Sequence, residues 1–298
     1  MRAWAVLWSI ARYEMLLLVR SWAFRIFSVL ALAVAALVPA AVALPRDVTY
    51  FFNRALPGAF PLLGLKLFNV FLGLIAVFLA TEFLKRDRRH DTSQVFYTQS
   101  FSNAAYVLGK FLGIFILLFL LLGLVLIIIG VIHIFFSRTP FVLQPYLLYI
   151  VLVTLPTVLF MVGLSVFLGS LIRSQPVVYL IALAYAFFSL VIVGPKAGAA
   201  FDSFAYFTPV IHSDFIGLGN AGALFLLRGG TAALGLGLIF AATLFMKRLR
   251  QSSIMNRGAA ALAVVLTVMG VALLIVHIRG GNADKGFRAE LRAASVTP

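Results

Sequence analysis

Seven long apolar runs constrain the fold of this 298-residue chain more than any other feature. A helix needs roughly 20 consecutive apolar residues to cross the hydrocarbon core of a bilayer. Runs of suitable length occupy residues 26–44, 61–81, 109–135, 146–171, 177–193, 229–246 and 258–278. Only 11% of the residues are charged, whereas a soluble domain carries about 25%. The sequence therefore predicts an all-α, polytopic membrane protein.

The Lys and Arg residues lie mainly at the ends of these runs, and the formal net charge is +15. In short loops such residues mark the cytoplasmic side and meet anionic headgroups of the lipid bilayer. They cluster on the side of the N-terminus, which predicts a cytoplasmic N-terminus and, with seven spans, an extracytoplasmic C-terminal tail. They form no stripe with interleaved aromatic residues outside the apolar runs, so nucleic-acid binding is not expected.

The first 20 residues carry too many charges to span a membrane and too many apolar side chains to stay in water. They include Trp4, Trp8, Arg12 and Arg20, which are residue types typical of a helix lying at the headgroup level. The sequence predicts an in-plane amphipathic helix here, and a frayed start to the first span is the alternative. Because Arg12 and Glu14 interrupt the apolar run, a cleavable signal peptide is not expected.

Three features inside the runs predict local structure. Pro156 lies in the middle of the fourth run, where its missing N–H predicts a kink. Lys66 lies near enough to the outer end of the second run for its ammonium group to reach the interface. Small residues four apart let helices approach closely, and they occur as Gly109 with Gly113, Ser165 with Gly169, and Ala233 with Gly237. Packing within the chain is the favoured interpretation of these pairs, and a dimer interface is the alternative.

Residues 195–228, between the fifth and sixth runs, are too aromatic for a solvated loop. The sequence predicts one or two short interfacial or re-entrant helices in the outer leaflet, interrupted by Pro209 and nearby glycines. The candidate residues of this segment are Phe204, Tyr206, Pro209, His212 and Asp214. His212 and Asp214, with Asp202 nearby, also suggest an outward metal or catalytic site, but a polar edge on an interfacial helix is the favoured interpretation.

The densest polar stretch of the chain lies between Glu82 and Lys110. A charge cluster opens this stretch and an aromatic segment follows it, which together favour an amphipathic surface that docks into a partner protein. The candidate docking residues are Glu82, Arg86, Arg88, Arg89, Asp91, Thr92, Val95, Phe96, Tyr97 and Lys110. An ordinary positive-inside loop is the alternative, and it explains the arginines but not the aromatic residues that follow them.

The chain carries no motif for chemistry of its own. A phosphate-binding loop, a zinc-protease motif and a nucleophile elbow are all missing from the sequence. The apolar runs contain almost no ionisable residues, whereas secondary transporters usually place such residues near the membrane centre. We therefore expect neither an enzyme nor a bound cofactor or metal in this chain, and we expect its energy to come from a partner. A non-transport scaffold subunit and an ion-coupled secondary carrier are the alternatives.

Three stretches follow one another as ARYEMLLLVRSW at 11–22, DTSQVFYTQSFSNAAYVLGKFLG at 91–113 and FAYFTPVIHSDF at 204–215. With the acidic residue Glu82 ahead of the second stretch, this order resembles the permease subunits of type-2 ABC transporters. The residues that match the recurring pattern of that family are Glu82, Asp91, Thr92, Val95, Phe96, Tyr97, Tyr106, Val107, Gly109 and Lys110. The family often has proline where this chain has Ser100 or Phe101, so the local turn differs.

The resemblance covers residues 1–250 and implies a permease domain with six common spans and an outer re-entrant helical hairpin before the sixth. It implies an ATP-driven exporter of a prokaryotic inner membrane, with two ATP-binding subunits and a second permease copy or paralogue. ATP and Mg²⁺ would be bound by the partner ATPase, and the 82–110 loop would be the coupling helix. Residues 251–298 depart from the six-span pattern and are expected to add a transmembrane helix and an extracytoplasmic tail.

Overall fold

The computed structural model describes residues 3–43, 59–89, 102–137, 140–172, 174–194, 201–208, 210, 212–213, 217–245 and 253–296. The elements in chain order are α1 (Ala3–Arg20), α2 (Trp22–Ala43), α4 (Ala59–Arg89), α6 (Asn103–Phe136), α7 (Leu143–Tyr149), the π-helix η2 (Ile150–Thr154), α8 (Leu155–Leu171), α9 (Gln175–Phe187), the π-helix η3 (Phe188–Val193), β1 (His212–Ser213), β2 (Gly217–Leu218), α11 (Ala221–Phe245) and α12 (Ser253–Val296).

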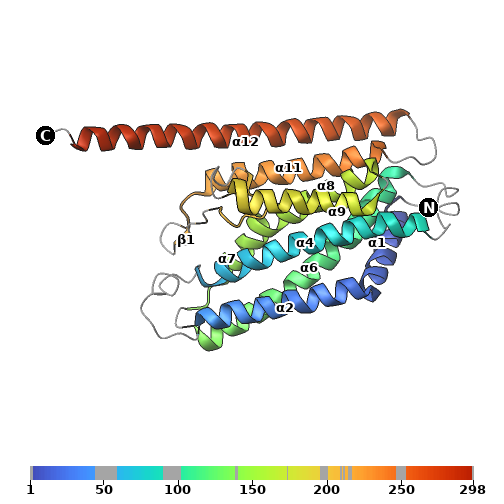
Figure 1. The fold of residues 1–298 in the computed structure, drawn as a ribbon, viewed down its shortest axis with the longest axis horizontal. Helices are drawn as coiled ribbons and strands as arrows, with labels where there is room; N and C mark the ends of the chain where they lie inside the picture. Colours follow the sequence, from blue (N-terminus) through green and yellow to red (C-terminus); the bar gives the residue numbers. More distant parts are fainter. Residues whose placement is uncertain are drawn as a thin grey trace.

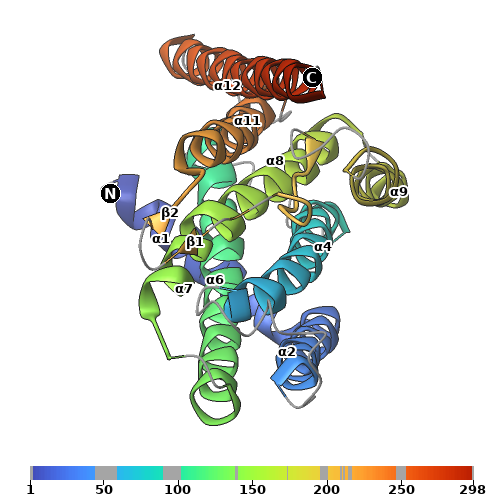
Figure 2. The ribbon, with the colours of Figure 1, turned by 90° about the vertical axis from the view of Figure 1, so that its left-hand side faces the viewer.

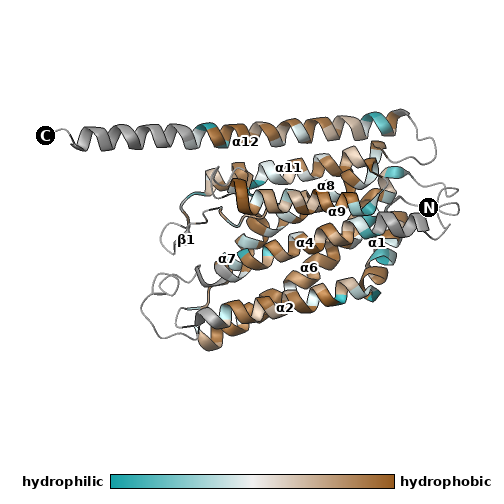
Figure 3. Ribbon diagram, viewed as in Figure 1, coloured by the Kyte–Doolittle hydropathy of each residue, from teal (hydrophilic) through white to brown (hydrophobic). Residues whose placement is uncertain are grey.

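Seven helical segments of the described chain are long and apolar enough to cross a membrane, as the sequence predicts. They lie side by side as a bundle, with α1 running across one end of it (Figure 1). Viewed nearly along the bundle, α8 lies in the interior, α6 runs obliquely from the interior to one edge, and α12 lies outside α11 (Figure 2). Apolar residues cover the length of the spans, and polar residues gather toward the helix ends (Figure 3). The prediction of an all-α, multi-pass membrane protein is confirmed at this level.

The observed helices extend past the apolar runs. α4 continues to Arg89, α6 begins at Asn103, and α12 ends at Val296. Helical hydrogen bonding is independent of side-chain polarity, so a helix can continue beyond the apolar stretch until a cap or a turn residue ends it. Ser102 is such a cap, because its Oγ accepts a hydrogen bond of 3.0 Å from the Ala105 amide.

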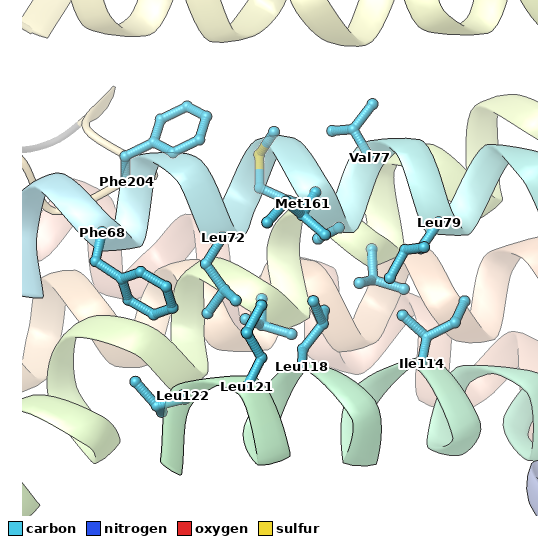
Figure 4. Close-up of a cluster of buried hydrophobic side chains, with 14 of the residues drawn as sticks. Phe68, Leu72, Val77, Leu79, Ile114, Leu118, Leu121, Leu122, Met161 and Phe204 are labelled. Carbon is cyan, nitrogen blue, oxygen red and sulfur yellow. The ribbon is translucent and has the colours of Figure 1, made fainter. Parts of the chain in front are cut away.

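The buried core of the bundle consists of aliphatic and aromatic side chains from α4, α6 and α8. Figure 4 shows Leu72 of α4 and Leu118 of α6 facing each other near Met161 of α8, and all three side chains are fully buried. Lipid tails are as apolar as these side chains, so helix association inside a membrane depends on close van der Waals packing and on polar contacts.

Glycines supply the closest helix contacts. A Cβ atom added to Gly235 of α11 would lie 2.5 Å from the Leu159 carbonyl carbon and from the Phe160 amide nitrogen of α8. Gly113 of α6 faces α1 in the same way, and Gly237 of α11 faces Thr267 of α12. For the pairs that contain Gly113 and Gly237, the favoured interpretation of packing within the chain is confirmed.

The fourth span is interrupted where the sequence predicts a kink. The π-helix η2 stands between α7 and α8, and Pro156 is the second residue of α8. Proline has no backbone N–H, so it cannot donate to the carbonyl of Leu152 four residues earlier. The i→i+5 spacing of η2 is a local response to that missing donor.

Where the sequence predicts a helical hairpin between the fifth and sixth spans, the described residues before α11 are not α-helical. Residues 201–208 form turns and bends, and His212 and Ser213 pair with Leu218 and Gly217 as the antiparallel strands β1 and β2. The Asp202 carboxylate instead accepts hydrogen bonds from the Phe207 and Thr208 amides, at 2.6 and 3.0 Å. A side-chain acceptor of this kind favours a turn over a helix.

The close contact between α8 and α11 yields a stability prediction. We expect Gly235→Ala to lower the free energy of unfolding by about 1–3 kcal/mol, because the added methyl group would overlap the α8 backbone. Gly123→Ala is the matched control, since nothing lies within 4 Å of a Cβ added at that position in the middle of α6. Unfolding of the purified variants in detergent measures the difference, and equal stabilities would contradict the proposed role of Gly235.

Candidate functional site

The N-terminal part of α6 packs directly on α1, at the bundle end predicted to be cytoplasmic. A Cβ atom added to Gly109 would lie 2.9 Å from the Ile10 side chain, and one added to Gly113 would lie 2.6 Å from the Ala11 carbonyl oxygen. The two helix backbones therefore approach as closely as glycine permits. A displacement of the first turns of α6 would consequently move α1 with them.

A buried ion pair joins the same two helices. The Lys110 ammonium lies 3.4 Å from a Glu14 carboxylate oxygen, and the two side chains are 7% and 1% exposed. The ammonium also lies 5.0 Å from the centroid of the Tyr106 ring, within the range of a cation–π contact. Burying either charge alone is costly, so the pair ties the position of α1 to that of α6.

This burial disagrees with the expectation that Lys110 is presented to a partner protein, because the Glu14 carboxylate holds its ammonium inside the bundle. Of the other predicted docking residues, Glu82 lies in α4 with a half-buried side chain, and Arg86, Arg88 and Arg89 lie in the last turns of that helix. The remaining docking residues lie outside the described residues, and these are Asp91, Thr92, Val95, Phe96 and Tyr97. Their docking role stays a prediction.

The side chains of α1 divide between an exposed and a buried set. Trp4, Trp8 and Arg12, each four residues apart, share an exposed stripe, and Trp4 and Trp8 are 69% and 49% exposed. Ala11, Glu14 and Leu18 are buried against the bundle. Arg20 is exposed at the end of the helix. The amphipathic character of α1 and its position in the plane of a membrane stay predictions.

A second polar group lies toward the opposite end of the bundle, around Arg228 of α11. The Arg228 side chain is 1% exposed, and its Nε donates to the Leu152 carbonyl at 2.9 Å. One terminal nitrogen donates to the Val153 carbonyl at 2.6 Å and to the Thr157 hydroxyl at 2.7 Å. Arg228 therefore supplies to Leu152 the donor that Pro156 lacks.

The other terminal nitrogen of Arg228 holds the chain between the fifth and sixth spans. It donates to the carbonyls of Asp202 and Ser203, at 3.1 and 3.4 Å. An arginine inside a membrane span is tolerated when backbone carbonyls or charged partners satisfy its donors. Arg228 meets that condition with five hydrogen bonds to two separate parts of the chain.

The predicted residues of this outer region separate in the structure. Phe204 is fully buried, whereas Tyr206 is 42% exposed. His212 lies in β1, and Pro209 and Asp214 lie outside the described residues. Within the part of the chain that the structure describes, no three His, Cys, Asp or Glu side chains are grouped so as to hold a metal ion.

The sequence does not predict that Arg228 is buried or that Glu14 pairs with Lys110, which it predicts only as a docking residue. The sixth apolar run begins at residue 229, so the sequence places Arg228 in the outer loop. Helical spacing carries the missing signal: Arg228, Thr231 and Gly235 lie at i, i+3 and i+7, which places them on one face. All three are buried in α11.

No model of a known protein family and no curated protein matches this sequence.

The buried ion pair yields a second prediction. We expect Lys110→Met to lower the free energy of unfolding by about 3–5 kcal/mol, because the Glu14 carboxylate would stay buried without its ammonium partner. The double variant Glu14→Met/Lys110→Met should recover most of that loss, since it leaves no uncompensated charge. Denaturant unfolding of Glu14→Met, Lys110→Met and the double variant measures the interaction free energy between the two side chains. Additive losses would show that the two side chains do not stabilise each other.

Proposed function

We propose that this chain is the membrane-spanning permease subunit of an ATP-driven transporter, of the type-2 ABC kind and acting as an exporter. In this proposal the bundle end that carries α1 faces the cytoplasm. One of two separate ATP-binding subunits docks there on the loop between α4 and α6, and a second permease copy or paralogue completes the membrane part. The ATPase binds ATP and Mg²⁺, and this chain converts the movement of the ATPase into rearrangement of its helices.

The observation that carries this proposal is the double attachment of α6 to α1. The loop with the predicted docking residues runs directly into α6, whose first turns are held against α1 by Gly109, Gly113 and the Glu14–Lys110 pair. A force applied to the loop would therefore act on two helices together. Such a rigid connection suits a subunit that a soluble partner drives mechanically.

The distribution of ionisable residues supports an external energy source. Among the described side chains, Lys66 lies near the start of α4 and Arg228 near the start of α11. Glu82 lies near the end of α4, and Lys110, near the start of α6, pairs with Glu14. The described core between them consists mainly of apolar side chains of α4, α6 and α8, with Thr81 and Ser165 among its few buried polar residues. A proton or cation relay needs ionisable or polar groups along its path, so this arrangement favours coupling through the docking loop over an ion-coupled carrier.

A triple variant tests the coupling role. We expect Glu82→Ala/Asp91→Ala/Phe96→Ala to insert into the membrane normally and to lose transport, because the docking surface is removed while the bundle is untouched. ATP hydrolysis by the associated ATPase should continue or fall without supporting transport. Vesicle transport and phosphate release, measured on the same preparation, check this outcome.

The control for this test is Phe187→Ala/Phe225→Ala, which removes two exposed aromatic side chains of α9 and α11. It should keep both transport and ATP hydrolysis. Purification in mild detergent separates the alternatives, because a scaffold subunit retains membrane partners without an ATP-binding protein. An ion-coupled carrier would transport on an ion gradient with no nucleotide present. Full transport by the triple variant would eliminate the proposed coupling role.

A further inference from the structure

The chain from Phe201 to Thr208, here called the outer segment, is mostly buried, with Phe201 and Tyr206 exposed, and it is not α-helical. Within it the amides of Ser203 and Ala205 donate to the carbonyls of Phe201 and Asp202, both at 3.1 Å. Side chains of the surrounding helices also donate to its carbonyl groups. Ser189 of η3 donates to Phe201 at 2.8 Å, Arg228 of α11 to Asp202 at 3.1 Å, Thr157 of α8 to Ser203 at 2.7 Å, Asn69 of α4 to Phe204 at 2.6 Å, and Lys66 of α4 to Thr208 at 2.7 Å. Irregular backbone at membrane depth needs such partners.

Thr157 is the centre of this arrangement. Its hydroxyl accepts hydrogen bonds from Asn69 at 2.9 Å and from Arg228 at 2.7 Å. A hydroxyl has a single hydrogen to donate, and two carbonyls lie within reach of it, those of Ser203 at 2.7 Å and Val153 at 3.0 Å. Arg228 also donates to Val153. The Thr157 hydroxyl is therefore free to hold the outer segment in this state and to turn back to its own helix when the segment leaves.

The Phe204 side chain packs the outer segment against α4. Its side chain is fully buried, and a Cβ atom added to Gly73 would lie 2.6 Å from a Phe204 ring carbon. The ring also lies in the buried cluster of Figure 4, above Phe68 and Leu72. Because Gly73 has no side chain, the aromatic ring rests directly against the α4 backbone.

The outer segment is incompletely satisfied in this position. Asp202 is 1% exposed and one of its carboxylate oxygens has no hydrogen-bond partner, and the same holds for the amide oxygen of the buried Asn69. Unsatisfied buried acceptors destabilise the arrangement that contains them. Lys66 donates to the Thr208 carbonyl, and its ammonium carries three N–H groups. It is thus available to the Asp202 carboxylate if the segment moves.

We propose that the outer segment is a gate at the outer end of the bundle, held closed by Arg228 and Thr157, with Phe204 as its plug. Opening releases the carbonyls of residues 201–204 as a unit, withdraws Phe204 from Gly73 and lets the Thr157 hydroxyl return to Val153. Arg228 keeps its bonds to Leu152 and Val153, so the fourth span stays intact while the gate moves. The passage of a cargo through the gate rests on the proposed transport function. The hydrogen bonds that hold the gate closed do not depend on it.

Thiol labelling tests the gate directly, because the chain contains no native cysteine. Ala205 is fully buried in the outer segment and Tyr206 beside it is 42% exposed. In intact cells, a membrane-impermeant maleimide should modify Ala205→Cys slowly and Tyr206→Cys rapidly. Adding Thr157→Val, which removes the hydroxyl but keeps the shape, should speed modification of Ala205→Cys about tenfold, since protection reports the opening equilibrium. Adding Thr157→Ser, which keeps the hydroxyl, should leave the slow rate unchanged.

Equal rates in the Val and Ser backgrounds would overturn the gate. Ser189→Ala is a milder second variant, because it removes only the bond to Phe201, and it should speed modification about threefold. An unchanged modification rate in this variant would also contradict the role of these hydrogen bonds in holding the gate closed. The Tyr206→Cys rate, the same in every background, shows that the reagent reaches the protein and that the variants are folded in the membrane.

A third arm separates the gate from the proposed function. In membranes where a bound ATPase is hydrolysing ATP, Ala205→Cys should be modified faster than without ATP. An unchanged rate during hydrolysis would mean that the outer segment is a static cap, and it would overturn the gate. If no ATPase is bound, the proposed function fails, and the comparison of Thr157→Val with Thr157→Ser then decides the gate by itself.

Discussion

The donors of Arg228 hold together the most irregular part of this structure. Pro156 leaves the Leu152 carbonyl without its helical donor, and Arg228 supplies one. The same guanidinium binds the carbonyls of Asp202 and Ser203, so a break in one span and a non-helical connection between two others are satisfied together. In an apolar environment an unpaired carbonyl is costly. The buried arginine is therefore the condition under which both irregularities persist.

Close backbone contact provides the remaining specificity of the bundle. Apolar side chains give little preference between lipid and protein surroundings, and most of this chain is apolar. Gly235 brings α11 against α8, and Gly109 and Gly113 bring α6 against α1. α12 packs on α11 through Gly230, Gly237 and Gly270, while its other described side chains, up to residue 281, are largely exposed. Positions without a side chain thus determine which helices become neighbours.

The membrane spans were predictable because each depends on a local property, a run of apolar residues long enough to cross a bilayer. The break near Pro156 was predictable for the same reason, since the missing N–H belongs to the proline itself. The outer segment was not predictable in this way. Its aromatic content suggested short helices, but of its described aromatic residues only Phe204 is fully buried, and Arg228, Thr157 and Asn69 from distant elements donate to its backbone.

The sequence by itself determined seven apolar spans and the polar stretch that follows Glu82, because hydrophobic length is a property of neighbouring residues. Only the tertiary structure decided that Lys110 pairs with Glu14 and that Arg228 lies inside the bundle. In both cases the partners lie on separate parts of the chain. A buried charge must be paired, and the packing of the helices decides which partner lies within reach.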